Sequence, residues 1–292
     1  MLILFIFGLI VGSFLNVVAL RYDPEKSVFN LKNLSGRSCC PQCRHTLYWY
    51  DTVPLFSFIF LLGKCRYCGA RISWRYPLVE IISGFVALFP LYLFNLWHIG
   101  GLLALGETIT WFYFIATFWT LALWSFLLLA LIDLRHFIIP DGTNLFIAAI
   151  GISKIFVLYL YEKFDLIHST FLDGFASIAG LRSNIFINYS AAALFGALFF
   201  GIIIYVTRGR GMGIGDLKLA IALGLILGWP DVVLAILLSF IIGSVVGLIF
   251  IIKTKKSIKK PLPFGPFMVL GVLVTIFFGF EILRAYFSFF NL

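Results

Sequence analysis

Long apolar runs recur along the whole chain, and they constrain its fold more than any other feature. The sequence predicts helices near 1–20, 77–97, 108–132, 142–161, 189–207, 217–229, 231–252 and 265–287. Nearly all of these have the roughly 18–25 residues that a helix needs to cross a hydrocarbon layer about 30 Å thick. Backbone groups left unpaired in lipid are costly, so segments that cross must be helical. The expected fold is an all-α polytopic membrane protein with about eight transmembrane helices.

The composition agrees with a membrane protein. Hydrophobic residues make up 62% of the chain, the mean hydropathy is +1.05, and only 12% of residues are charged. A soluble domain has about twice that share of charged residues. The run at 217–229 is the shortest, and Gly228-Trp229-Pro230 ends it before the next run begins. Of the expected helices, it is the least suited to a full crossing.

The positive charges divide unevenly between the two sides that these helices define. One side consists of segments 21–76, 133–141, 208–218 and 253–264, which hold 18 of the 22 Lys and Arg residues. The positive-inside rule makes this side cytosolic and turns both chain termini outward. The net charge of +9 then reflects topology and contact with anionic lipid headgroups, not nucleic-acid binding. The outward side receives Lys154, Lys163, Arg182 and Arg284.

Two aspartates stand at the ends of apolar runs on the expected cytosolic side. Asp133 opens DLRHFIIPD (133–141), and Asp216 closes GMGIGD (211–216). An ionisable group beside the hydrocarbon is costly and is a functional candidate by default. If helix packing brings the two together, they can share one proton and one water, as an aspartic protease dyad does. Asp141 is the alternative to Asp133, which is favoured because it directly follows an apolar run.

Cysteine spacing gives the second strong signal. Two CxxC pairs, CPQC (40–43) and CRYC (65–68), lie in the expected cytosolic loop, and Gly63 and Gly69 flank the second, as a tight turn requires. Cytosolic thiols stay reduced, and four thiolates in two such turns suit a structural tetrahedral zinc. The alternatives are a redox pair and a metal-free thiol cluster. The expected ligands are Cys40, Cys43, Cys65 and Cys68, with Cys39 left over. A closed four-cysteine site has no open coordination position for catalysis.

These features predict three parts: a first transmembrane helix at 1–20, a cytosolic zinc-binding loop at 21–76, and a multi-helix aspartic protease domain at 77–292. The loop contains an apolar run at 55–62 that is too short to span a membrane. The run belongs either to a small zinc-stapled core or to a segment lying along the membrane interface. The interface is the preferred interpretation, because Trp and Tyr accompany the run.

Four polar or small positions in the first two apolar runs also carry expectations. The first run is expected to be a retained helix, since no basic region precedes it and no clear cleavage site follows. Gly8 and Gly12 give it a small-residue face for close helix packing, and Asn16 is expected to face another helix. Glu80, at the start of the second run, is expected to be a helix-dipole or ion-pair residue, with a functional role as the alternative.

The motifs, taken together, resemble those of one family. In chain order they are GSFLNVV (12–18), CPQC, WYD (49–51), GKCRYC (63–68), ISWRYPLVE (72–80), DLRHFIIPD, GMGIGDLKL (211–219) and PFGP (263–266). This order resembles the bacterial type IV prepilin peptidases, the leader peptidases and N-methyltransferases of pilus and type II secretion systems. The GxGD motif alone is shared with presenilin-like intramembrane proteases. Its combination with the tetracysteine loop is far more specific.

The resemblance implies a function and a site. Asp133 and Asp216 would be the catalytic aspartates. The substrate would be a prepilin or pseudopilin precursor, whose short basic leader lies in the cytosol and is removed at a Gly before the apolar pilin helix. Many members then methylate the new amino terminus with S-adenosylmethionine, and the protein would lie in the bacterial inner membrane. No Gly-rich Rossmann signature is present, so the methyl-donor residues stay unknown, with Glu80 as a speculative contact. Arg135-His136 and a long outward stretch at 162–188 depart modestly from the family pattern.

Two functions from other classes compete with this one. In a transporter or channel, the intramembrane acids would carry protons or cations. That function explains the acids but leaves the cysteine loop unexplained. In a non-catalytic assembly scaffold, the cysteine loop would serve as a docking module. Cleavage of a prepilin by the purified protein supports the peptidase, whereas proton flux without cleavage supports the transporter.

Overall fold

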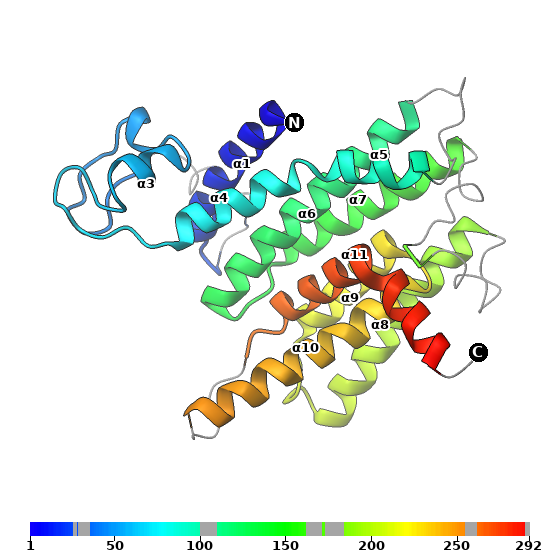
Figure 1. Ribbon diagram of the computed structural model, residues 1–292. Helices are drawn as coiled ribbons and strands as arrows, with labels where there is room; N and C mark the ends of the chain where they lie inside the picture. The colour runs from blue at the N-terminus through cyan, green and yellow to red at the C-terminus, as the bar shows by residue number, and fades with distance from the viewer. Residues whose placement is uncertain are drawn as a thin grey trace.

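The regular secondary structure of the described residues is helical, and two isolated β-bridges occur beside it (Figure 1). The computed structural model describes residues 1–25, 28, 36–99, 110–161, 171–172, 184–254 and 262–289. Most of the predicted outward stretch 162–188 and most of the basic segment 253–264 therefore lie outside the described residues. The elements are α1 (Leu2–Arg21), η1 (Trp49–Asp51), α3 (Phe56–Phe60), α4 (Arg75–Val86), α5 (Phe89–Ile99), α6 (Thr110–His136), α7 (Asp141–Leu160), α8 (Ile185–Thr207), α9 (Ile214–Leu227), α10 (Asp231–Thr254) and α11 (Gly265–Phe289).

The helices confirm the predicted fold class, including the doubt over a full crossing by the run at 217–229. Among the described residues, seven helical segments are long and apolar enough to cross a membrane. The sixth predicted run, which forms α9, has 14 helical residues and is about 21 Å long at 1.5 Å per residue. A hydrocarbon layer is about 30 Å thick, so α9 does not reach across it. The predicted helix at 77–97 is interrupted after Val86, which divides it into α4 and α5.

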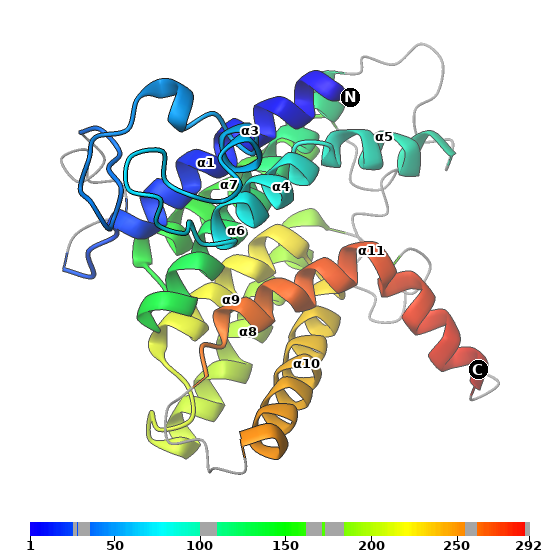
Figure 2. The same cartoon turned by 60° about the vertical axis from the view of Figure 1, so that its left-hand side comes forward.

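Helix α6 lies between two groups of helices (Figures 1 and 2). On one side, α1 packs along α4, and both contact α6. On the other side, α9 packs against α7 and α8, α10 packs against α11, and both α7 and α11 contact α6. The segment that carries α3 projects from the ends of α1 and α4, away from the other helices. This arrangement separates the cysteine-bearing segment from the group that contains α9.

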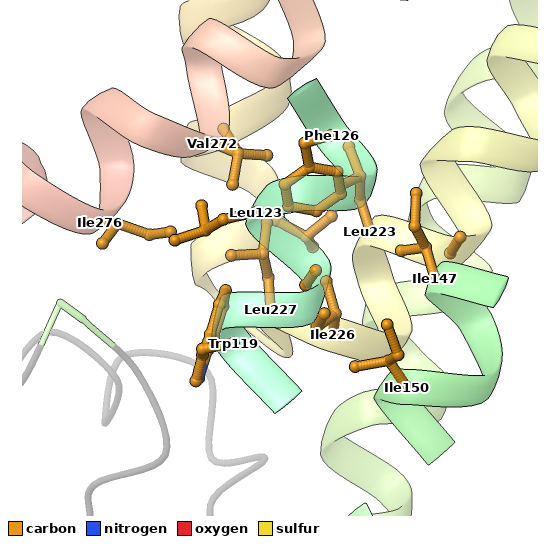
Figure 3. Close-up of a cluster of buried hydrophobic side chains, with 14 of the residues drawn as sticks. Trp119, Leu123, Phe126, Ile147, Ile150, Leu223, Ile226, Leu227, Val272 and Ile276 are labelled. Atoms are coloured by element: carbon orange, nitrogen blue, oxygen red, sulfur yellow. The ribbon is translucent and has the colours of Figure 1, made fainter. Parts of the chain in front are cut away.

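Helix α9 runs through the middle of the larger group, where its side chains form the centre of the core (Figure 3). Its residues Leu223, Ile226 and Leu227 are buried on all sides. They lie among side chains of three other helices, which are Trp119, Leu123 and Phe126 of α6, Ile147 and Ile150 of α7, and Val272 and Ile276 of α11. A helix that is apolar all round suits such a position. The surrounding helices therefore shield the short α9 from lipid.

The small-residue face predicted for α1 is confirmed. A Cβ atom added to Gly8 would lie 2.5 Å from the Ser83 carbonyl oxygen, so α1 and α4 approach too closely for any larger residue there. A Cβ atom on Gly12 would lie 2.7 Å from the Ser83 Cβ. Asn16 is buried, and its Nδ2 donates to the Tyr76 carbonyl oxygen at 3.3 Å, so it faces α4 as expected.

Candidate active site and metal centre

Two similar turns carry the CxxC pairs of the N-terminal segment. In each turn, the backbone N–H four residues after the first cysteine donates to that cysteine's carbonyl at 2.9 Å, from Arg44 to Cys40 and from Gly69 to Cys65. Both donors have left-handed backbone conformations, with φ of 56° at Arg44 and 68° at Gly69. Glycine adopts this conformation without strain, which confirms the turn predicted at the second pair.

The two turns bring the four predicted cysteines together. The Sγ atoms of Cys40, Cys43, Cys65 and Cys68 all lie within 4.8 Å of one another, and those of Cys40 and Cys68 are 3.9 Å apart. Tetrahedral coordination with Zn–S distances of about 2.3 Å requires sulfurs about 3.8 Å apart, so the cluster fits such an ion. The backbone hydrogen bond at Cys43 lowers the pKa of the Cys40 thiol to about 7, which favours the metal-binding thiolate. Cys39 is exposed and lies outside this cluster.

Asp51 links the second CxxC turn to the segment that follows the first CxxC turn. Its carboxylate accepts hydrogen bonds from Arg66 Nε at 2.7 Å, from the Tyr67 hydroxyl at 2.9 Å and from the Tyr48 backbone N–H at 3.2 Å. Arg66 and Tyr67 are the two residues between Cys65 and Cys68. Hydrogen bonds to a charged group are stronger than neutral ones. The WYD motif, which sequence analysis found only through the family resemblance, therefore has a structural role in this segment.

Glu80 anchors the apolar run at 55–62 to helix α4. The Glu80 side chain is buried, and its Oε2 accepts the Leu55 backbone N–H at 2.8 Å. This hydrogen bond explains the burial of Glu80 without a methyl donor. Phe56, Ile59 and Phe60 of the run are exposed, so they do not form the centre of a small core. Their exposure supports the interpretation that the run lies along the membrane interface.

Asp133 lies in the last turn of α6 and is 3% exposed. Its Oδ2 accepts the backbone N–H of Gly265, the first residue of α11, at 2.9 Å. A Cβ atom on Gly265 would lie 2.6 Å from that oxygen, so the approach requires glycine. Sequence analysis listed PFGP (263–266) only as part of the resemblance. The structure shows that this segment brings a backbone donor to Asp133.

Asp216 lies in the first turn of α9 and is half-buried. Its Oδ2 accepts the Gly213 backbone N–H at 3.0 Å, so the carboxylate caps the helix that carries it. The adjacent Gly215 packs against the connection between α6 and α7, where a Cβ atom added to it would lie 3.2 Å from the Ile139 Cβ. Asn144 Nδ2 donates to the Gly215 carbonyl oxygen at 3.5 Å. The start of α9 is therefore held against the start of α7.

The structure places Asp133 and Asp216 at the same end of the bundle and engages Asp141 elsewhere. Gly215, next to Asp216, packs against Ile139 in the connection that follows Asp133 and the end of α6. Asp141 instead forms an ion pair with Lys218, whose Nζ lies 2.8 Å from each carboxylate oxygen. The Asp141 side chain is 72% exposed. An exposed carboxylate bound to a lysine is less suited to hold a proton and a water than a buried pair of acids.

Sequence analysis missed Gly265 and Asn144 as parts of this site. Gly265 belongs to a motif with two prolines, which indicates a rigid helix entry but not the acid that the glycine meets. Asn144 is a buried polar residue one turn into an apolar helix, and that pattern is a usable signal. Its partner Gly215 lies 71 positions away in sequence, so no local pattern identifies the contact.

Comparison with known proteins adds a family to this geometry. The model of the Bacterial Peptidase A24 N-terminal domain matches residues 6–94, and that of the Type IV leader peptidase family matches residues 119–248. The prepilin leader peptidase/N-methyltransferase of Pseudomonas aeruginosa is 31% identical over 97% of this chain and 91% of its own length.

The chain belongs to the type IV leader peptidase family. Relatives with the same name from Stutzerimonas stutzeri and Aeromonas salmonicida are 31% and 30% identical and cover 97% and 98% of this chain, with 92% and 93% of their own lengths aligned. No solved structure matches the chain. The type IV leader peptidase match contains both Asp133 and Asp216, and the N-terminal match contains all four clustered cysteines. Membership in this family confirms the resemblance drawn from the motifs.

Proposed function

We propose that this protein is a membrane aspartic endopeptidase that removes the leader peptide of type IV prepilins and pseudopilin precursors and then N-methylates the new amino terminus. The observation that carries the proposal is the placement of Asp133 and Asp216 at one end of the helix bundle. They come from α6 and α9, and each has one carboxylate oxygen bonded to a backbone amide. The names of the relatives supply the substrate class and the second activity.

The two carboxylates divide the work of hydrolysis. Two acids whose charges interact resist joint ionisation, so the pair is proposed to share one proton. The ionised acid takes a proton from water, whose oxygen bonds to the scissile carbonyl carbon, while the protonated acid hydrogen-bonds the carbonyl oxygen. The C–N bond then breaks, and the proton passes to the leaving amine, which becomes the pilin amino terminus. The backbone bonds from Gly213 and Gly265 hold both carboxylates in fixed orientations.

We propose that the dyad faces the cytosol from the bacterial inner membrane, with the amino terminus outward. Arg135, Arg208, Arg210 and Lys218 lie in the segments that flank the dyad. This accumulation of basic residues supports a cytosolic side under the positive-inside rule and favours contact with anionic lipid headgroups. A prepilin whose own helix spans the same membrane would then present its leader junction at the depth of the two aspartates.

The cysteine cluster is proposed to hold a structural zinc ion in the loop 21–76, between the first helix at 1–20 and the protease region that follows. Zinc suits four thiolates at these spacings, and a closed set of this kind holds turns together instead of performing catalysis. S-adenosylmethionine, which carries a methyl group on a sulfonium, is the proposed methyl donor. Its site is proposed to lie between this loop and the adjoining helix ends, on the side where the freed amine emerges.

A single assay tests both activities. Purified protein is incubated with a purified prepilin and labelled S-adenosylmethionine, and the intact mass of the pilin product is measured. The proposal expects a mass loss equal to the leader and a gain equal to one methyl group at the new amino terminus. Intact precursor after prolonged incubation overturns the peptidase. Proton flux into vesicles without cleavage favours the transporter instead.

Zinc content is the first prediction for the metal centre. The purified protein is expected to contain about one zinc ion per chain. Cys40→Ser combined with Cys43→Ser is expected to release the ion and to loosen the segment around the two turns, because metal binding and folding are coupled in such sites. Elemental analysis and limited proteolysis measure both effects, with Cys39→Ser as the matched control that keeps its zinc. A gently purified wild-type protein that lacks metal and has all five thiols open to alkylation refutes the site.

The Asp51 brace gives a second prediction. Asp51→Asn removes the charge that Arg66 and the Tyr67 hydroxyl bond to, so the second CxxC turn should open more often. The expected result is a several-fold faster release of zinc to a chelator. Glu25→Gln is the matched control, because it removes one acidic charge from an exposed side chain in the same region. Equal release rates in the two variants would show that Asp51 does not brace the site.

A further inference from the structure

A lysine and an aspartate are buried within the bundle, far from the catalytic pair. Lys154 is 3% exposed and Asp231 is 0% exposed, and their charges interact electrostatically. Lys154 lies thirteen residues after Asp141, or about 20 Å along α7. The charge count placed it on the outward side, and the structure shows that its side chain is buried. Buried charges within a membrane-spanning bundle are costly, so their retention calls for a specific role.

The contacts of Lys154 all come from neighbouring helices. Its Nζ donates to the Ile226 carbonyl oxygen of α9. The same atom lies 5.0 Å from the centroid of the Trp119 ring on α6 and 4.7 Å from that of the Tyr189 ring on α8. Aromatic faces stabilise a cation that has lost its water. The helix α6 continues past Trp119 to Thr110, so this cluster lies within the spanning region and not beyond its end.

Lys154 supplies a hydrogen-bond donor to the C-terminal end of α9. Ile226 is the last residue but one of α9, and the final carbonyls of a helix have no partners within the helix. Since α9 is a half-span, these carbonyls lie among apolar side chains and away from water. A cation at a helix C-terminus satisfies them and complements the helix dipole. Asn188 holds the next turn, accepting from the Trp229 N–H at 2.9 Å and donating to the Trp229 carbonyl at 3.0 Å.

The C-terminal half of α9 is packed closely against α7 and α8. A Cβ atom on Gly151 of α7 would lie 2.7 Å from the Leu225 carbonyl oxygen, and one on Gly224 of α9 would lie 2.5 Å from the Ala193 Cα of α8. These distances show that α9 is tightly packed on two sides. Asp216 stands in the first turn of the same helix. A shift of α9 along its axis therefore moves Asp216 relative to Asp133.

We propose that Lys154 is a positioning residue for the reaction. By bonding the C-terminal carbonyl of α9, it fixes the axial position of this half-span and so sets Asp216 against Asp133, and Asp231 balances the charge that this bond requires. The inference rests on the proposed role of Asp216 in cleavage. A misplacement of about 1 Å costs roughly 100-fold in rate, so an anchor ten residues from Asp216 along α9, or about 15 Å, has a measurable effect on kcat.

Two double variants that differ only in the donor test this role. Lys154→Met with Asp231→Asn removes both charges and the donor to the Ile226 carbonyl, whereas Lys154→Gln with Asp231→Asn removes both charges but keeps an N–H donor. Asn at position 231 still accepts the Phe171 N–H that Asp231 binds at 2.8 Å. Lys253→Met, on an exposed part of α10, controls for the loss of a lysine. The measurements are thermal midpoint, kcat and KM for prepilin cleavage, and hydrogen exchange of residues 214–227.

We expect the Met double variant to keep a thermal midpoint near that of the wild type, to lose about 10- to 100-fold in kcat with little change in KM, and to exchange faster at 214–227. The Gln double variant is expected to retain most of the wild-type kcat. Equal kcat in the two double variants overturns the inference. If the Met form does not fold, a folded Gln form as inactive as Asp216→Asn overturns it as well. Cleavage by Asp216→Asn itself would instead refute the proposed function.

Discussion

Asp133→Asn and Asp216→Asn are each expected to abolish leader cleavage while leaving expression and membrane insertion unchanged. Each role in the mechanism needs a carboxyl group that can change its protonation, and an amide cannot do so. Loss of general acid–base catalysis costs about 10²- to 10⁴-fold, so the remaining rate should fall to the background of the assay. The measurement is the initial rate of prepilin cleavage per folded enzyme in detergent or vesicles.

Asp141→Asn is the matched control for this prediction. It removes a carboxylate from the same end of the bundle, but one that is exposed and bound to Lys218 Nζ. We expect it to retain substantial activity, because an exposed ion pair contributes little and touches neither aspartate of the dyad. An inactive Asp141→Asn together with an active Asp133→Asn would move the catalytic role from Asp133 to Asp141.

Much of the fold was accessible from hydropathy, because a membrane requires helices of fixed length. The predicted runs correspond to described helices with small shifts at their ends, except that 77–97 is divided into α4 and α5. Hydropathy alone did not show that the 14 residues of α9 form a helix buried in the core. Length indicated that this run was short, but its burial among α6, α7, α8 and α11 comes from packing. Charge counting gave no sign that Lys154 is buried, because the count has no term for packing against buried partners.

The site was partly predictable for similar reasons. Chemical type and spacing identified the four cysteines, since metal ligands recur at short local intervals. Topology identified Asp133 and Asp216, because both had to lie at helix ends on one side. The groups that orient them are not local. Gly265 lies 132 residues from Asp133, and Arg66 and Tyr67 reach Asp51 only after the chain has folded back. The sequence around a glycine does not indicate which distant side chain its backbone N–H will bond.

The second large effect that we expect is a separation of the two activities. Asp216→Asn should block cleavage of the precursor yet still permit methylation of a pilin that has already been cut. The dyad lies where α6 meets α9, while the cysteine cluster lies on the α1 and α4 side of α6. Methyl transfer to a free amine needs no acid at the scissile carbonyl. One assay with labelled S-adenosylmethionine and pre-cleaved substrate measures the outcome.

A variant of the cysteine segment that still folds should show the opposite bias, with a larger loss of methylation than of cleavage. Asp51→Asn is suitable, because it weakens the second turn without removing a cysteine. Some communication between the regions remains, since Arg75 Nη2 donates to the Leu131 carbonyl of α6 at 3.2 Å, two residues before Asp133. This contact allows a modest fall in cleavage as well. If Asp216→Asn removes methylation of pre-cleaved pilin as completely as it removes cleavage, then the two reactions share one site, and the cysteine segment only supports it.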